Sequence, residues 1–177
     1  MTEPDMEGRI AELESRLRRL EDERDIAQLI AAYGPLVDAG AATEVAGLWT
    51  HDGIYDVDEV YLEGHEQLAA MVLSRAHQSW IERGCAHFVG PARVTVDGDT
   101  AIAVCHSLMV VQKDGRFVVR RATANHWALV RTDEGWRVSR RTNRVLDGRP
   151  ESPGLLAAGA RGAASPIRAE MGVERRI

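Results

Sequence analysis

The stretch AAYGPLVDAG, residues 31 to 40, ends a long helical pattern and sets the interpretation of the rest of the chain. It holds two polar side chains, Tyr33 and Asp38, in an otherwise apolar segment. A histidine, His87, follows about fifty residues later, at the start of an apolar segment with the character of a strand. From this pattern we predict that Asp38 and His87 meet in a pocket and form an acid–base dyad.

Residues 8 to 32 show the apolar spacing of a helix. Its first half carries a short heptad seam, in which apolar residues recur in alternating steps of three and four. The seam consists of Ile10, Leu13, Leu17 and Leu20. Two heptads are too few to hold a coiled coil alone. Two interpretations therefore stay open: an amphipathic helix packed on its own domain, or an arm that clasps another subunit.

The end of this helix determines where Asp38 points. Pro35 has no N–H and its ring crowds the preceding turn, so Gly34-Pro35 is predicted to bend or interrupt the helix. Gly40 is the predicted stop. On an ideal wheel Asp38 lies about 100° from Val37, away from the centre of the apolar face. Asp38 is then either solvated or swung inward by a kink at Pro35.

The remaining pattern predicts helices first and an antiparallel meander after them, which is an α+β arrangement. A short helix over 42–53, capped by Thr43, precedes a strand and turn over 54–64 and a third helix over 65–84. Asp-Gly turns separate the long strands of the meander. These strands are predicted within 85–98, 100–115, 116–135 and 136–146.

Composition and charge exclude several classes of function. The chain has 177 residues, of which 45% are hydrophobic and 28% charged, with a net charge of −5. That balance lacks the basic footprint of a nucleic-acid partner, and no apolar run reaches the ~20 residues of a membrane helix. The N-terminus has no secretory pattern and the two cysteines have no CxxC spacing, so we expect a cytoplasmic protein with reduced thiols. The six histidines contain no His-x-x-x-His pair and the glycines form no phosphate loop, so no metal or cofactor is expected.

Five segments together resemble the SnoaL-like branch of the nuclear-transport-factor-2-like superfamily. They are LEDERDIAQLIAAYGPLVDAG, AGLWTHDGIYDV, GHEQLAAMV, VDGDTAIAVCHSLMVV and DEGWRVSRR. The resemblance implies a cone-shaped α+β barrel, in which a curved, mostly antiparallel sheet wraps around the N-terminal helices and a pocket lies at the open end. We expect a helical arm over 1–25 continuous with the domain, the SnoaL-like domain over 26–146, and a C-terminal tail over 147–177 that is loosely held or wrapped around a neighbour.

Dehydratases and dehydrochlorinases of that superfamily, such as scytalone dehydratase, bile-acid 7α-dehydratase and lindane dehydrochlorinase, share a pattern of site residues. A polar residue and an aspartate lie five apart at the end of the first helix, and a histidine follows about fifty residues later. Tyr33, Asp38 and His87 match these positions, which implies that they are the catalytic residues.

An arginine in the last strand often completes the set, and the segment SRRTNR offers three. Alternation along a strand places Arg140 and Arg144 on the face of Trp136 and Val138, and Arg141 on the other face. Arg144 is favoured for the pocket, with Arg140 as the second choice. The other residues that we predict to bind substrate or line the pocket are Tyr55, His106, Asn125 and Trp127.

The dyad suits proton abstraction beside a carbonyl group. A neutral imidazole with a pKa near ~6.5 is the natural base at neutral pH, and a carboxylate on its other nitrogen stabilises the imidazolium that forms. The resemblance and the dyad predict a cofactor-free lyase (dehydratase) or isomerase for a small, mostly apolar hydroxy-carbonyl compound of steroid, polyketide or aromatic type. The alternative is a non-catalytic ligand-binding or assembly module of the same fold. A homo-oligomer, either dimer or trimer, is expected from the arm and the tail.

Overall fold

A computed structural model describes residues 3–167 as a mixed α+β domain. The helices are α1 (Glu3–Asp38), α2 (Ala42–Ala46), α3 (Gly64–Leu73), α4 (Arg75–Arg83) and α5 (Glu151–Ala160). The strands are β1 (Trp49–Val57), β2 (Val60–Glu63), β3 (Cys85–Val89), β4 (Arg93–Asp97), β5 (Thr100–Lys113), β6 (Arg116–Thr132) and β7 (Gly135–Val145). No helix in this range combines the length and the apolarity needed to cross a bilayer.

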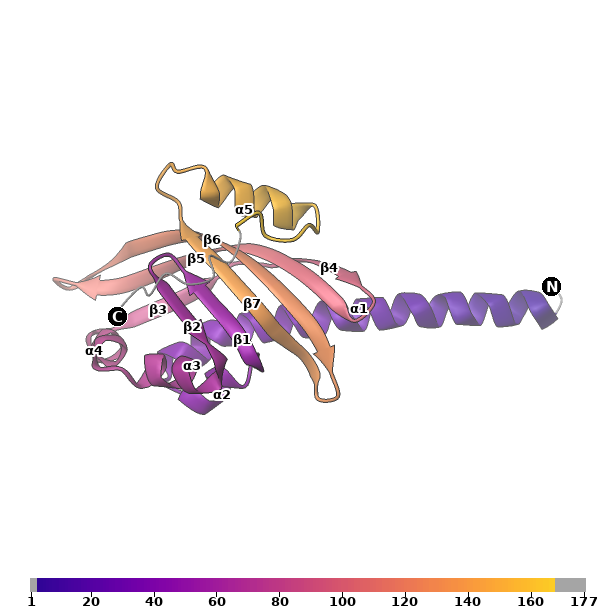
Figure 1. Ribbon diagram of the computed structural model, residues 1–177, viewed down its shortest axis with the longest axis horizontal. Coiled ribbons are helices and arrows are strands. Elements are labelled where there is room, and N and C mark those ends of the chain that lie inside the picture. Colours follow the sequence, from indigo (N-terminus) through magenta and orange to yellow (C-terminus); the bar gives the residue numbers. More distant parts are fainter. Residues whose placement is uncertain (1–2, 168–177) are drawn as a thin grey trace.

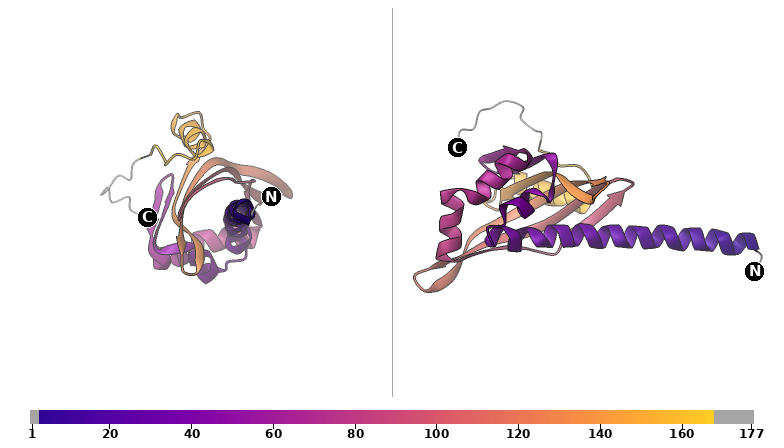
Figure 2. Two further views of the ribbon diagram at one scale, coloured as in Figure 1. Left: turned by 90° about the vertical axis from the view of Figure 1, so that its right-hand side faces the viewer. Right: turned by 90° about the horizontal axis from the view of Figure 1, so that it is seen from below.

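All seven strands belong to one sheet with the order β2-β1-β7-β6-β5-β3, and β4 pairs with the other end of β5. The β1–β7 pair is parallel and every other pair is antiparallel. The sheet curves around the second half of α1, and α5 lies on its outer face (Figures 1 and 2). The predicted α+β class and the curved, mostly antiparallel sheet are confirmed. Because β2 and β3 remain as separate edges, the sheet stays open and does not close into a full barrel.

The second half of α1 fills the concave side of the sheet. Its inward face repeats at helical spacing and consists of the buried residues Ile26, Ile30, Tyr33 and Val37. Of the predicted bend or interruption at Gly34-Pro35, the interruption is wrong, because the exposed Pro35 is accommodated within a helix that continues to Asp38. The predicted stop is confirmed: Gly40 has a φ of 69° and donates to the Val37 carbonyl, while Ala41 donates to that of Leu36.

Three predicted elements differ from the observed ones. Helix α2 ends at Ala46, its Thr43 is not the cap, and Trp49 already pairs with β7, so β1 begins earlier than expected. The third helix is divided at Ser74, whose hydroxyl caps α4 by accepting from the His77 N–H. The run over 85–98 forms two strands because residues 90–92, Gly-Pro-Ala, interrupt the ladder.

The expectation of a loosely held tail is wrong for residues 151–160. They form α5, whose apolar side is buried against the outer face of the sheet, with Leu155 fully buried. A Cβ added to Gly159 would lie 2.5 Å from the Cβ of Val104, so the small residues allow the helix to approach the strand closely. The same glycines and alanines hide the helical periodicity in the sequence. Residues 168–177 of the predicted tail lie outside the described range.

The first half of α1 projects beyond the sheet (Figure 1). The helix meets the domain at Asp22, whose carboxylate accepts from the Arg131 guanidinium at 2.8 Å and from the Trp136 indole at 3.0 Å. Before that point the seam residues are 49 to 63% exposed. The interpretation in which the seam packs on its own domain is therefore wrong.

Candidate active site

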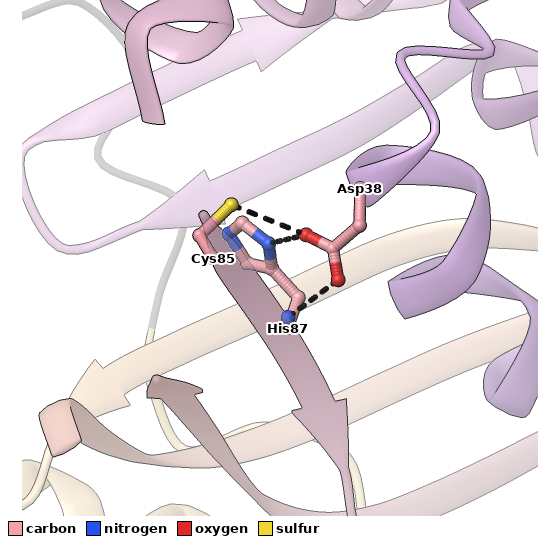
Figure 3. Close-up of side chains that lie close together, drawn as sticks. All are labelled: Asp38, Cys85 and His87. Carbon is pink, nitrogen blue, oxygen red and sulfur yellow. Dashed lines mark hydrogen bonds and ion pairs between the residues drawn. The ribbon is translucent and has the colours of Figure 1, made fainter. Parts of the chain in front are cut away.

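Asp38, at the end of α1, and His87, on the edge strand β3, are in direct contact (Figure 3). The ring Nδ1 of His87 lies 2.6 Å from one oxygen of Asp38, and the backbone N–H of His87 donates to the other oxygen at 2.7 Å. The thiol of Cys85, two residues earlier on β3, donates to the first oxygen at 3.5 Å. The carboxylate thus holds both the ring and the backbone of His87.

The protonation of this pair follows from its contacts. Burial would raise the pKa of Asp38, but hydrogen bonds from the ring and backbone of His87, the charge of His87 and the Cys85 thiol together lower it below its ordinary value of 3.8. Asp38 is therefore ionised at neutral pH. A carboxylate only accepts hydrogen bonds, so Nδ1 of His87 carries a hydrogen. When the ring is uncharged, its lone pair is therefore on Nε2.

Asp38 reaches His87 because α1 lies unusually close to β3. Gly34 precedes Asp38 by one helical turn and shares its side of the helix. A Cβ added to Gly34 would lie 2.0 Å from the carbonyl oxygen of His87, so only a residue without a side chain fits there. Close helix–strand contact, and not a break at Pro35, turns Asp38 toward the sheet.

His87 lines a pocket with a cavity volume of about 70 Å³ that is partly open to solvent. The apolar lining consists of Val57, Val89, Leu108 and Met109. The polar lining consists of Tyr33, Tyr55, His87, Ser107, Arg121, Thr123, Arg141 and Asn143. The lining of the pocket is therefore a mixture of polar and apolar side chains.

Tyr33 and Tyr55 form a buried pair in this lining. Their hydroxyl oxygens are 3.3 Å apart, and the side chains are 3% and 9% exposed. Burial is the main reason that the pKa of Tyr33 is raised, with the neighbouring Tyr55 adding to it. Tyr33 thus stays a neutral phenol at any physiological pH and acts through its O–H.

The arginine in the pocket is Arg141, so the preference for Arg144 or Arg140 is wrong. Both of those guanidiniums pair instead with Asp56, at 2.8 Å from Arg144 and 3.0 Å from Arg140. The reason is a β-bulge at Ser139: Leu129 faces Val138, whereas Ala128 faces Arg140.

The extra residue shifts the alternation of β7 by one. Opposite residues of a ladder share a face, and Trp127 is opposite Arg141. Arg141 therefore lies on the same face of the sheet as Val138. Simple alternation from the start of β7 predicts the opposite face for Arg141.

Arg141 is buried, with 4% of its surface exposed. Its Nε and one terminal nitrogen donate to the side-chain oxygen of Asn125 at 3.0 and 2.7 Å, and its guanidinium lies 4.3 Å from the Tyr33 ring centroid. The other terminal nitrogen, Nη1, is buried without a hydrogen-bond partner. Within residues 3–167, Arg141 forms no ion pair with a carboxylate. The lining thus contains a fixed positive charge that no acidic side chain in this range neutralises.

The model of the SnoaL-like domain family matches residues 18–142, which is most of the chain. The chain belongs to the SnoaL-like family. An NTF2-like protein with a cystatin-like fold from Novosphingobium aromaticivorans is 46% identical, with a TM-score of 0.80 over 81% of this chain and 94% of that one. Among curated proteins, none is significantly similar in sequence.

More distant structures share the fold alone. A single-residue variant of Rv3472, a protein of unknown function from Mycobacterium tuberculosis, is 20% identical, with a TM-score of 0.63 over 88% of this chain and 95% of that one. A second N. aromaticivorans protein, provisionally assigned as a scytalone dehydratase, is 16% identical, with a TM-score of 0.60 over 75% and 87% of the two chains.

Three of the expected lining residues of this SnoaL-like domain lie elsewhere. His106 is exposed, because its side chain points away from the face that carries Cys105 and Ser107. Trp127 is fully buried in the core, with its ring centroid 5.9 Å from that of Tyr33. Asn125 is also fully buried, behind the lining, where it holds Arg141. The expectation is wrong for His106, and Trp127 and Asn125 support the lining from behind.

Several polar lining residues were not anticipated from the sequence. The Ser107 and Thr123 hydroxyls are 2.7 Å apart, and the Asn143 amide donates to Thr123 at 2.9 Å. Arg121 donates to Asn143 at 2.8 Å and pairs with Asp58. One sequence pattern could have identified Thr123. It lies two residues before Asn125 and four before Trp127, and alternate residues of a strand share a face. Placing Asn125 at the site therefore also places Thr123 there.

Asp38, Cys85 and His87 are the one group of three described side chains whose potential metal-binding atoms lie within 4.8 Å of one another. Burial and the charge of Asp38 raise the pKa of Cys85 to about 11, so its sulfur remains a protonated donor. The Nδ1 of His87 also carries a hydrogen directed at Asp38. Without a metal the three side chains form a hydrogen-bonded cluster, and a metal that bound here would have to displace the hydrogens of the thiol and of Nδ1.

Proposed function

We propose that this SnoaL-like protein is a cofactor-free lyase of the dehydratase type, or an isomerase, acting on a small, mostly apolar hydroxy-carbonyl compound. The observation that carries the proposal is the 2.6 Å contact between Asp38 and His87 at the edge of a pocket. A catalytic base needs an unprotonated atom within reach of substrate and a partner that stabilises its charged form. Nε2 of His87 is that atom, and Asp38 is that partner.

The first step is removal of a proton from the carbon beside the carbonyl. Nε2 of His87 takes the proton, and the electrons of the C–H bond form a carbon–carbon double bond while the carbonyl oxygen becomes negative. Asp38 stabilises the resulting imidazolium, since its carboxylate already accepts from Nδ1.

The negative oxygen needs hydrogen-bond donors and positive charge aimed at it. Tyr33 and Tyr55 provide hydroxyl donors, and the buried charge of Arg141 lies beside the Tyr33 ring. Asn125 acts as a positioning residue, because it holds two nitrogens of Arg141 from behind the lining. Since the guanidinium has no acidic partner within residues 3–167, its field is not cancelled locally.

The second step decides between the two reaction types. In a dehydration, the enolate electrons expel the hydroxyl group from the next carbon, and the proton held by His87 joins it to give water. In an isomerisation, that proton returns to a different carbon and nothing leaves. Both sequences conserve atoms and electrons without an added oxidant or reductant.

The lining of the pocket supports a substrate with one polar end. Small-molecule sites usually enclose roughly 300–1,000 Å³, whereas this cavity has a volume of about 70 Å³, so the proposal requires lining side chains to move as substrate enters. Valine, leucine and methionine side chains suit a hydrocarbon ring system, while the tyrosines and Arg141 suit a carbonyl oxygen. The free thiols of Cys85 and Cys105 are in keeping with a cytoplasmic protein.

The test is a screen of hydroxy-ketone and hydroxyacyl compounds for loss of water or movement of a double bond. We expect turnover by the native protein and a loss of about 10²–10⁴-fold in kcat for His87→Ala. The matched control is His106→Ala, which removes an exposed histidine from the opposite face of the sheet. Equal turnover by the native protein and His87→Ala would contradict a catalytic role for the dyad. Binding of a compound without turnover by either protein would favour a ligand-binding module.

A further inference from the structure

The projecting part of α1 carries an apolar stripe with no cover from its own domain. Its members are Met6, Ile10, Leu13, Leu17 and Leu20, which are 48%, 49%, 59%, 56% and 63% exposed. Single exposed leucines are common on protein surfaces, but a continuous row of five along one helix marks an interaction site. The stripe spans about 21 Å at the rise of an α-helix.

The residue types in the stripe are those of a two-stranded coiled coil. In heptad notation Ile10 and Leu17 occupy a positions, and Met6, Leu13 and Leu20 occupy d positions. Ile10 at a with Leu13 at d is the combination that favours two strands over three or four, whereas Leu17 at the other a position does not discriminate. A second copy of the same chain provides the matching row.

The flanking charges select the direction of the two helices. Arg9 and Arg16 occupy g positions, and Glu14 and Glu21 occupy the e positions that follow them. In a parallel pair each g residue faces the next e residue of the other helix, so Arg9 meets Glu14 and Arg16 meets Glu21, on both sides. In an antiparallel pair g faces g and e faces e, which would set arginine against arginine and glutamate against glutamate.

The exposed part of the seam lies before the point at which α1 enters its own domain. Continued by whole heptads, the a positions lead to Arg24 and Ala31, which are exposed, and the d positions lead to the half-buried Ala27 and the buried Gly34. The core-facing residue Ile26 lies about 200° around the helix from Arg24. The exposed seam therefore ends where α1 enters its own domain, and the proposed coil is confined to residues 6–20, before the contact of the helix with the domain at Asp22.

We propose that two copies of this chain associate through a parallel coiled coil of residues 6–20. Two heptads are marginal for isolated peptides because helix nucleation is costly. Here the second half of α1 is already helical and packed in the sheet, so the arm extends an existing helix. The expected product is a symmetric dimer with both active-site domains at the same end of the coil.

Sedimentation equilibrium of the full chain tests the association. We expect the native protein to sediment at twice its 19.5 kDa monomer mass at high micromolar concentration. The double variant Leu13→Glu/Leu17→Glu should sediment as a monomer, and Ser15→Glu, at an outward f position, should remain a dimer. All three side chains are exposed in the monomer, so the domain should keep its circular dichroism spectrum and thermal unfolding. A monomeric native protein, or a double variant that stays dimeric, would overturn the proposal.

Disulfide trapping tests the direction of the helices. In a parallel pair Ile10 lies beside Ile10 of the second copy, so Ile10→Cys should form a covalent dimer on mild oxidation. Ser15→Cys is the control at an outward position, and the native chain gives the background from Cys85 and Cys105. A dimer that Ile10→Cys fails to trap would contradict the parallel pairing and indicate an antiparallel pair or an arm docked on the other domain.

Discussion

The backbone of Gly34 lies directly against the backbone of His87. A Cβ built on Gly34 would be 2.0 Å from the carbonyl oxygen of His87 and 3.8 Å from its Cβ. One helical turn later, Asp38 reaches the ring and the N–H of the same histidine. The position of His87, the proposed base, therefore depends on the lack of a side chain at Gly34.

Replacing Gly34 by alanine should separate the dyad. Alanine favours the helix by up to ~1 kcal/mol over glycine, but the methyl group forces the helix and strand apart, which typically costs about 1–3 kcal/mol. We expect a net loss of stability of about 1–2 kcal/mol by urea unfolding. We also expect a fall in kcat larger than the change in KM, since the Asp38–His87 contact lengthens.

Gly8→Ala is the matched control in the same helix. A Cβ at Gly8 would meet nothing within 4 Å, so only the helix propensity changes. Stability should rise by up to about 1 kcal/mol and activity should stay the same. If Gly34→Ala behaved like Gly8→Ala, the close contact with β3 would not matter for the site.

Stability should depend on the charge of Asp38 in an acidic range. Its pKa in the folded protein is lowered below the ordinary 3.8, so the unfolded chain takes up this proton first as the pH falls. The contribution of ionised Asp38 to the free energy of unfolding is therefore complete above pH 3.8. It is lost as the pH falls through the lower pKa that Asp38 has in the folded protein. Asp38→Asn should reduce the free energy of unfolding by about 1–3 kcal/mol at neutral pH, and the difference from the native protein should shrink below about pH 4.

Urea titrations at a series of pH values measure this effect. Asp133→Asn is the control, because Asp133 lies exposed in the β6–β7 turn. A native-minus-Asp38→Asn difference that is constant from neutral pH to about pH 2 would show that the charge of Asp38 contributes nothing.

The contact between Asp38 and His87 could be predicted from the sequence, but the reason that the two residues meet could not. The apolar face of α1, the hairpin turns and the strand start at Cys85 all follow from periodicity and turn chemistry. The inward direction of Asp38 does not, because an ideal wheel treats Gly34 as a neutral position. A glycine permits the close approach of two backbone segments, but its presence in a sequence does not show that such an approach occurs.

The arginines of the last strand show a second limit of prediction from the sequence. Alternation along β7 holds on each side of Ser139 but not across it, since one inserted residue reverses every later side chain. Nothing in SRRTNR marks a bulge, so the face of Arg141 follows from its pairing with Trp127 rather than from its own neighbours. The error over α5 has a related origin: small residues pack closely and carry little periodic signal.

The bulge leads to a prediction about neighbouring arginines. Arg141→Met removes the buried charge from the pocket and should lower kcat/KM by about 10²–10³-fold, the usual cost of losing one oxyanion donor. Arg144→Met, three residues along the same strand, leaves Asp56 paired with Arg140 and should change kcat/KM by less than about 3-fold. Arg141→Lys restores charge but not the two-point contact with Asn125, so a partial loss is expected. A greater effect at Arg144 than at Arg141 would reverse the assignment of the two faces.

Cys85 offers a chemical probe of the same cluster without any substrate. Burial and, after it, the charge of Asp38 raise the pKa of the Cys85 thiol to about 11. Because the thiolate is the reactive form, alkylation by iodoacetamide at pH 8 should be far slower than that of free cysteine. Asp38→Asn removes the negative charge beside the thiol, so alkylation should become several-fold faster, whereas Asp133→Asn should leave the rate unchanged. Cys105 is 4% exposed and should contribute little, which Cys85→Ala would check. A native rate equal to that of free cysteine would mean that the thiol is not held beside the carboxylate, and the hydrogen-bonded cluster in Figure 3 would then be wrong in solution.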